Sequence, residues 1–175
     1  MSPDPATVER VDVRVPVRST SADGEAESRF AIELTQQSDY RFEARFDNPA
    51  VPPLIIDEPA PLGSDAGPNP ARLLATSVAG CLSASLLFVM RRFKNEPGPI
   101  RAVATVSMTR NAQHRLRIGR IAVDLHLGVL AGELRMLDRI LGQFENFCTV
   151  TQSVRAAFPV DVRVLDKAHS VLGAP

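Results

Sequence analysis

Alternating apolar and polar residues indicate β-strands at the beginning of the chain. Valines occupy every second position over 11–17, and a second alternating run covers 29–36 after a polar turn. A period of two is typical of a strand that buries one face. We therefore expect residues 1–37 to form a β-hairpin.

The same period recurs further along the chain. Further strands are predicted at 40–46, 54–57, 101–109, 115–127 and 158–165. A polar turn at 111–114 joins two of them, which predicts an antiparallel pair. In the strand over 40–46, the charged residues Arg41, Glu43 and Arg45 share one face, opposite the apolar one.

A long uncharged segment predicts the main helix. Residues 58–70 are rich in proline and glycine and should form a loop. Asn69 followed by Pro70 is a strong helix start, so we expect a helix over about 70–94. The uncharged run over 73–90 has the length of a membrane span, but its Ser, Thr and Gly content favours a core helix.

Helical spacing returns near the C-terminal end. Residues 133–147 carry apolar side chains three and four positions apart, which predicts one amphipathic helix. A short helix is expected over 149–157, and we expect residues 166–175 to be a loosely held tail. Strands, a long helix, strands, helices and a strand in that order indicate an α+β fold.

Length and charge limit the function. The 175 residues suit a single domain. Twenty basic and twenty acidic residues balance, and tryptophan is absent, so neither a net field nor stacking platforms favour nucleic acid as a partner. We therefore expect that the protein binds neither nucleic acid nor a membrane, and that its partner is neutral or small.

The sequence motifs exclude several kinds of chemistry. His114, His126 and His169 have no paired metal-ligand spacing, so no metal is expected. The sequence contains no phosphate-binding loop motif and no GxSxG motif. It therefore does not favour a nucleotide-dependent enzyme or a serine hydrolase of the GxSxG type.

The two cysteines, Cys81 and Cys148, are the remaining candidates. The first residues do not have the pattern of a signal peptide, so we expect the protein in the reducing cytoplasm. In that compartment the two cysteines could be two buried thiols or a redox pair, and both interpretations stay open. Periodicity alone makes Cys81 an inert core residue. Position alone makes Cys148 the better nucleophile, since the first turn of a following helix would favour its thiolate.

Two segments resemble one family. NPARLLATSVAGC at 69–81 resembles the NPxxLxxAxxxxC motif of the OsmC/Ohr family of cysteine-based hydroperoxide reductases, and FENFCTVTQSVRAAFPVDVRV at 144–164 resembles its second-cysteine segment. The resemblance covers about residues 40–165. It implies an N-terminal extension over 1–37, an OsmC-like domain over 38–165 and a C-terminal tail over 166–175.

The resemblance implies a fold, an oligomeric state and a reaction for this protein. The resemblance implies an OsmC-like fold, an intertwined homodimer whose long central helices are wrapped by antiparallel β-sheets. It implies a thiol peroxidase in which Cys81 attacks the hydroperoxide and Cys148 resolves the product, which reverses the assignment made from position. An external dithiol would reduce the disulfide, and no bound cofactor is needed.

The chain departs from the family in its charged groups. The family's glutamate, ten residues before the first cysteine, falls on Ala71, and Glu58 or Glu145 is an open replacement. The family's activating arginine matches Arg45, our preference, or Arg41, although both could belong to a solvated charged face.

Two other functions remain open. One is a non-catalytic OsmC-like protein that binds a small molecule in an apolar cleft at the dimer interface. The other is a different thiol enzyme with Cys148 as nucleophile, which lacks a nearby histidine base.

Overall fold

The first sheet has three antiparallel strands. The computed structural model describes residues 29–173. Strands β1 (Ile32–Ser38), β2 (Arg41–Phe46) and β3 (Leu54–Ile56) pair in that order. β1 is the second strand of the expected N-terminal hairpin, and it pairs with β2; the first strand, over 11–17, lies outside the described residues.

The long helix α1 (Pro70–Arg92) begins where the sequence predicted. The Asn69 side-chain oxygen accepts a hydrogen bond from the Arg72 N–H at 3.0 Å, and Pro70 occupies the first turn, where its missing N–H costs nothing. Arg91 and Arg92 in the last turn stabilise the negative end of the helix dipole.

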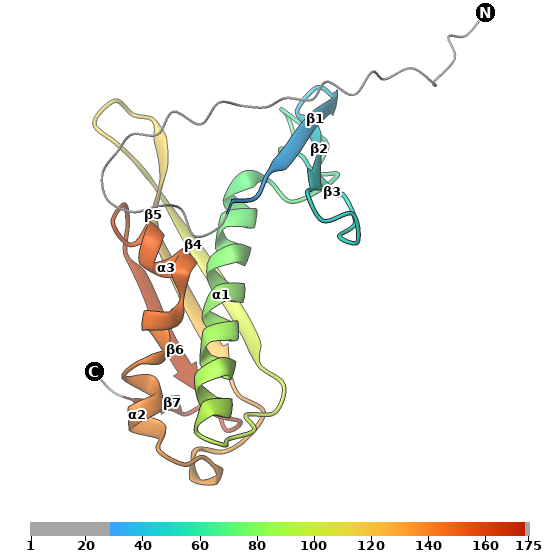
Figure 1. Ribbon diagram of the computed structural model, residues 1–175. Coiled ribbons are helices and arrows are strands. Elements are labelled where there is room, and N and C mark those ends of the chain that lie inside the picture. The colour runs from blue at the N-terminus through green and yellow to red at the C-terminus, as the bar shows by residue number, and fades with distance from the viewer. Residues whose placement is uncertain (1–28, 174–175) are drawn as a thin grey trace, which may run out of the picture. The chain divides into compact units, whose positions relative to one another are not determined.

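The second sheet carries α1 on one face (Figure 1). Its strands pair in the order β4 (Arg101–Arg110), β5 (Leu116–His126), β6 (Val160–Leu165) and β7 (Val171–Leu172). β5 and β6 are parallel and the other pairs are antiparallel. The α+β fold class is therefore confirmed.

The core lies between α1 and this sheet. Alternate residues of β5 and every third or fourth residue of α1 point into one apolar cluster. Its fully buried members include Val78, Leu82, Leu86, Val89, Ile121 and Leu125. By length and composition α1 could also cross a membrane, and 44% of its most apolar 18-residue window is buried inside the protein.

The prediction of a single helix over 133–147 is wrong. The segment forms a 3-10 turn η1 (Ala131–Glu133), a short helix α2 (Leu137–Leu141) and a second 3-10 turn η2 (Phe144–Phe147). The cause is buried Asn95, whose side chain accepts from the Arg135 N–H at 2.7 Å and donates to the Arg135 carbonyl at 3.0 Å. These bonds occupy the backbone groups that a continuous helix needs.

The expectation of a loosely held tail from residue 166 onward is also wrong for residues 166–173. The buried Asp166 carboxylate accepts from the N–H groups of Ala131, Ala168 and Ser170. β7 then pairs with β6, and Leu172 is buried in the core. Side-chain hydrogen bonds to backbone groups thus hold this segment on the sheet.

Candidate active site

The fold brings the two cysteines together. Cys81 lies in the middle of α1, partly exposed, and packs against the core. Cys148 is fully buried and immediately precedes α3 (Thr149–Val154). Since α1 packs against both η2 and α3, two thiols far apart in the sequence become neighbours. Both are free.

The environment of Cys148 favours its neutral form. Burial raises the pKa of the Cys148 thiol, and the neighbouring Cys81 thiol raises it further. The neighbouring Thr151 acts on the pKa in the opposite direction. The expectation that the first turn of the following helix would favour a Cys148 thiolate is therefore wrong, because desolvation outweighs it.

Thr151 is the direct polar partner of Cys148. The Cys148 Sγ donates a hydrogen bond to the Thr151 Oγ1 at 3.0 Å, and Thr151 is itself fully buried. Sequence reasoning missed this residue. The signal was its spacing, since a residue three positions after a helix-capping residue faces the capping side chain.

The two candidate arginines are engaged elsewhere. Arg45 forms an ion pair with Glu43 across 2.6 Å on β2, and 58% of its side chain is exposed. Arg41 donates a hydrogen bond to the Ser64 Oγ at 3.1 Å, while its buried Nε has no partner. Neither of these interactions involves Cys81 or Cys148.

The candidate replacements for the family glutamate also have other partners. Glu145 pairs with Arg155, which in turn donates to the Val160 carbonyl at 3.0 Å. Glu58 accepts from the Asn69 side chain at 3.5 Å. These contacts support the Cys148 segment and the start of α1, so neither glutamate is shown holding an arginine beside Cys81.

An aromatic pair lies next to the Cys148 segment. The rings of Phe88 and Phe147 have their centroids 5.5 Å apart, and both side chains are about half exposed. Phe147 directly precedes Cys148, and Phe88 lies two turns after Cys81 on α1. This surface favours apolar molecules.

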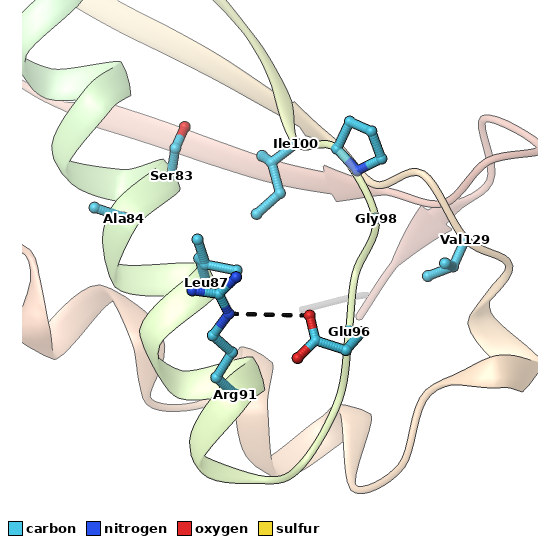
Figure 2. Close-up of a pocket in the computed structure, with 9 residues that line it drawn as sticks. Ser83, Ala84, Leu87, Arg91, Glu96, Gly98, Ile100 and Val129 are labelled. Carbon is cyan, nitrogen blue, oxygen red and sulfur yellow. Dashed lines mark ion pairs between the residues drawn. The ribbon is translucent and has the colours of Figure 1, made fainter.

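The opposite side of α1 is open. Figure 2 shows a groove between α1 and the segment leading into β4, lined by Ser83, Ala84, Leu87 and Ile100. At its rim the Arg91 Nε lies 3.9 Å from the Glu96 Oε2. A neighbouring cavity of about 660 Å³ continues along Gly80 and Thr76. Small residues on this face allow another helix to approach closely.

The histidines form no metal centre in the described part of the chain. Residues 29–173 contain no group of three or more His, Cys, Asp or Glu side chains placed to hold a metal ion. His126 and His169 contact each other edge to face, with ring centroids 5.6 Å apart, and His114 lies in the turn between β4 and β5.

Comparisons with known proteins identify the fold. The family model described as OsmC-like protein matches residues 63–163, more than half of the chain. No curated protein sequence matches this chain.

Several solved structures are similar over their whole length. A putative osmotic stress induced and detoxification response protein from Psychrobacter arcticus is 21% identical, with a TM-score of 0.64 over 79% of this chain and 98% of that one. The organic hydroperoxide resistance protein OhrB of Bacillus subtilis is 20% identical, with a TM-score of 0.59 over 77% and 98%. An OsmC-like protein of unknown function from Vibrio cholerae is 13% identical, with a TM-score of 0.66 over 79% and 99%. At these identities the likeness shows the fold.

Proposed function

Because this chain belongs to the OsmC-like protein family, we propose that it is a cysteine-based thiol peroxidase that reduces organic hydroperoxides. The observation that carries the proposal is the proximity of Cys81 and Cys148: Cys81 packs against the core cluster that contains Cys148, and it lies close enough to raise the pKa of the Cys148 thiol. The names of structural neighbours, among them organic hydroperoxide resistance proteins, support the same chemistry.

The proposed reaction has three steps. The Cys81 thiolate attacks the distal oxygen of ROOH, which carries the hydrogen, and becomes a sulfenic acid as the O–O bond breaks; RO⁻ leaves and takes up a proton from water to give ROH. The Cys148 sulfur then attacks the Cys81 sulfur, and the sulfenic oxygen leaves as water with the Cys148 proton. An external dithiol reduces the resulting disulfide and is itself oxidised by two electrons.

Exposure and charge support these roles. Cys81 is partly exposed, whereas Cys148 is fully buried and has a raised pKa. A thiol that the substrate can reach from solvent suits the first attack. A protonated Cys148 supplies the proton that leaves with the sulfenic oxygen as water in the second step. The half-exposed Phe88 and Phe147 rings favour organic over inorganic peroxide.

We also propose that the protein is a homodimer. The support is the open face of α1, where Gly80 and Ala84 are exposed and two cavities run beside the helix. A helix face made of small residues permits a close helix–helix contact. Arg45, and after it Arg41, remain the proposed cations for the Cys81 thiolate.

A second function is favoured by a specific observation. Arg45 and Arg41 are paired with Glu43 and Ser64, and Ala71 replaces the family's glutamate. A thiol peroxidase needs a cation to hold its thiolate. The alternative is a non-catalytic protein that binds a small molecule in an apolar cleft at the dimer interface.

One experiment separates the two functions. The reduced protein is treated with one equivalent of cumene hydroperoxide, and free thiols and residual peroxide are measured. A peroxidase loses both thiols and consumes the peroxide within minutes, and the Cys81→Ser variant does neither. Persistence of both thiols and of the peroxide through a long incubation would give the binding function the lead.

A further inference from the structure

We propose that the reducing thiol attacks the Cys81 sulfur of the Cys81–Cys148 disulfide, and that Cys148 leaves as a thiolate held by Thr151. The inference deepens the proposed function and rests on it, since it concerns the step that returns the oxidised protein to its dithiol form. It assigns the site of the mixed disulfide and a catalytic role to Thr151.

Access decides which sulfur is attacked. Thiol–disulfide exchange requires the incoming thiolate to approach one sulfur along the S–S axis, opposite the leaving sulfur. Cys148 is completely buried under η2 and α3, within the same apolar cluster as Leu82 and Phe144. Cys81 keeps part of its surface exposed. An external thiol can therefore reach Cys81 without displacing α3. It can reach Cys148 only if α3 is displaced.

Thr151 is placed to receive the leaving sulfur. Its Oγ1 lies 3.0 Å from the Cys148 Sγ. A hydroxyl can accept from a thiol and donate to a thiolate. The same contact can thus serve Cys148 in both states. Hydrogen bonds to the charged form stabilise it, and a better-stabilised thiolate leaves faster.

The exchange balances in two steps. The donor thiolate forms an S–S bond with Cys81 as the Cys81–Cys148 bond breaks and its electron pair stays on Cys148. The second thiol of the donor, as thiolate, attacks the donor sulfur of the mixed disulfide and releases the Cys81 thiolate. The donor ends as a cyclic disulfide, oxidised by two electrons, and the protein disulfide is reduced.

Trapping the mixed disulfide identifies which sulfur the reducing thiol attacks. The full-length protein is oxidised with diamide, treated with 2-mercaptoethanol, and quenched at early times with N-ethylmaleimide before peptide mass mapping. We expect the mercaptoethanol adduct on Cys81 and the maleimide on Cys148. The reverse labelling, or equal labelling of both cysteines, would overturn the proposal, as would failure of diamide to link the two sulfurs.

This design separates the inference from the proposed function. Diamide oxidises thiols without a hydroperoxide, so a protein that ignores cumene hydroperoxide but shows adducts on Cys81 refutes the peroxidase alone. A protein that consumes hydroperoxide but carries the adduct on Cys148 refutes the inference alone.

Matched variants test Thr151. Thr151→Val keeps the shape and removes the hydroxyl, whereas Thr151→Ser keeps the hydroxyl. We expect disulfide reduction by 2-mercaptoethanol to slow about tenfold in the valine variant, the effect of one hydrogen bond to a charged sulfur, and to change less than twofold in the serine variant. In a Cys81→Ser background, thiolate absorbance should show a higher Cys148 pKa with valine than with threonine. Equal rates and equal pKa values for valine and threonine would remove Thr151 from the mechanism.

Discussion

Cys81, in the middle of the long helix, packs against the core cluster that contains Cys148, although the two cysteines lie far apart in the sequence. Burial and the neighbouring Cys81 thiol raise the pKa of Cys148. At neutral pH Cys148 is therefore a protonated thiol, and in disulfide formation its proton leaves with the sulfenic oxygen as water.

Alkylation should distinguish the two thiols. At pH 7.5, iodoacetamide should label Cys81 well before Cys148, because Cys148 is buried and protonated. Both should react at similar rates after unfolding in urea. Peptide mass mapping over time measures the order, and faster labelling of Cys148 in the folded protein would contradict the assigned roles.

Single cysteine variants should fail at different steps. Cys148→Ser should still consume one equivalent of cumene hydroperoxide and accumulate a sulfenic acid at residue 81, detected with a dimedone probe. Cys81→Ser should lose at least a hundredfold in peroxide consumption, because the attacking sulfur is missing. The opposite pattern would indicate Cys148 as the nucleophile.

Asp57 should make the fold acid-sensitive. Its buried carboxylate accepts from the N–H groups of Glu58, Ser64 and Ala66 and from the Ser64 hydroxyl. These bonds lower the Asp57 pKa from 3.8 to about 2. A lowered pKa contributes stability that is present above pH 3.8 and is lost as the pH falls through about 2.

The Asp57→Asn variant isolates that contribution. It should lower the melting temperature by several degrees at pH 7 and flatten the loss of stability between pH 4 and 2, measured by thermal unfolding. Asp65→Asn is the matched control, because Asp65 is exposed and its ion pair with Arg72 is 3.4 Å long. Equal acid profiles for wild type and Asp57→Asn would contradict the assignment.

Asn95→Ala should destabilise the protein by about 2 kcal/mol, since it leaves the N–H and carbonyl of Arg135 without partners. Urea unfolding measures this change. Glu96→Ala, next in sequence, should change stability by less than about 0.5 kcal/mol, because Glu96 is exposed and its contact with Arg91 is 3.9 Å long. Equal effects of the two substitutions would argue against the role given to Asn95.

Gly80 tests the dimer. Nothing lies within 4 Å of a Cβ built at Gly80, so a single chain accepts a side chain there. If the central helices of two subunits meet at this face, Gly80→Arg should convert the dimer to a folded monomer in sedimentation analysis. Gln113→Arg, in the turn between β4 and β5, should leave the dimer intact. A Gly80→Arg protein that stays dimeric would place the subunit contact elsewhere.

The sequence by itself determined the elements whose signals are local. The Asn69–Pro70 start of α1, the period-two strands β2, β4, β5 and β6, and the loop before α1 all appear as predicted. Capping, proline geometry and side-chain alternation involve only residues within a few positions, so they can be read along the chain. The two cysteine motifs likewise indicated the family that the OsmC-like match shows.

Only the tertiary structure decided the state of the thiols and the breaks in 133–147. The Cys148 pKa depends on how completely η2, α3 and α1 bury its sulfur, and the helix break depends on Asn95, 40 positions before Arg135. Burial and long-range hydrogen bonds depend on which distant segments pack together. Sequence position and periodicity each describe one segment at a time. Position before a helix made Cys148 a favoured thiolate, periodicity made 133–147 a single helix, and packing reversed both.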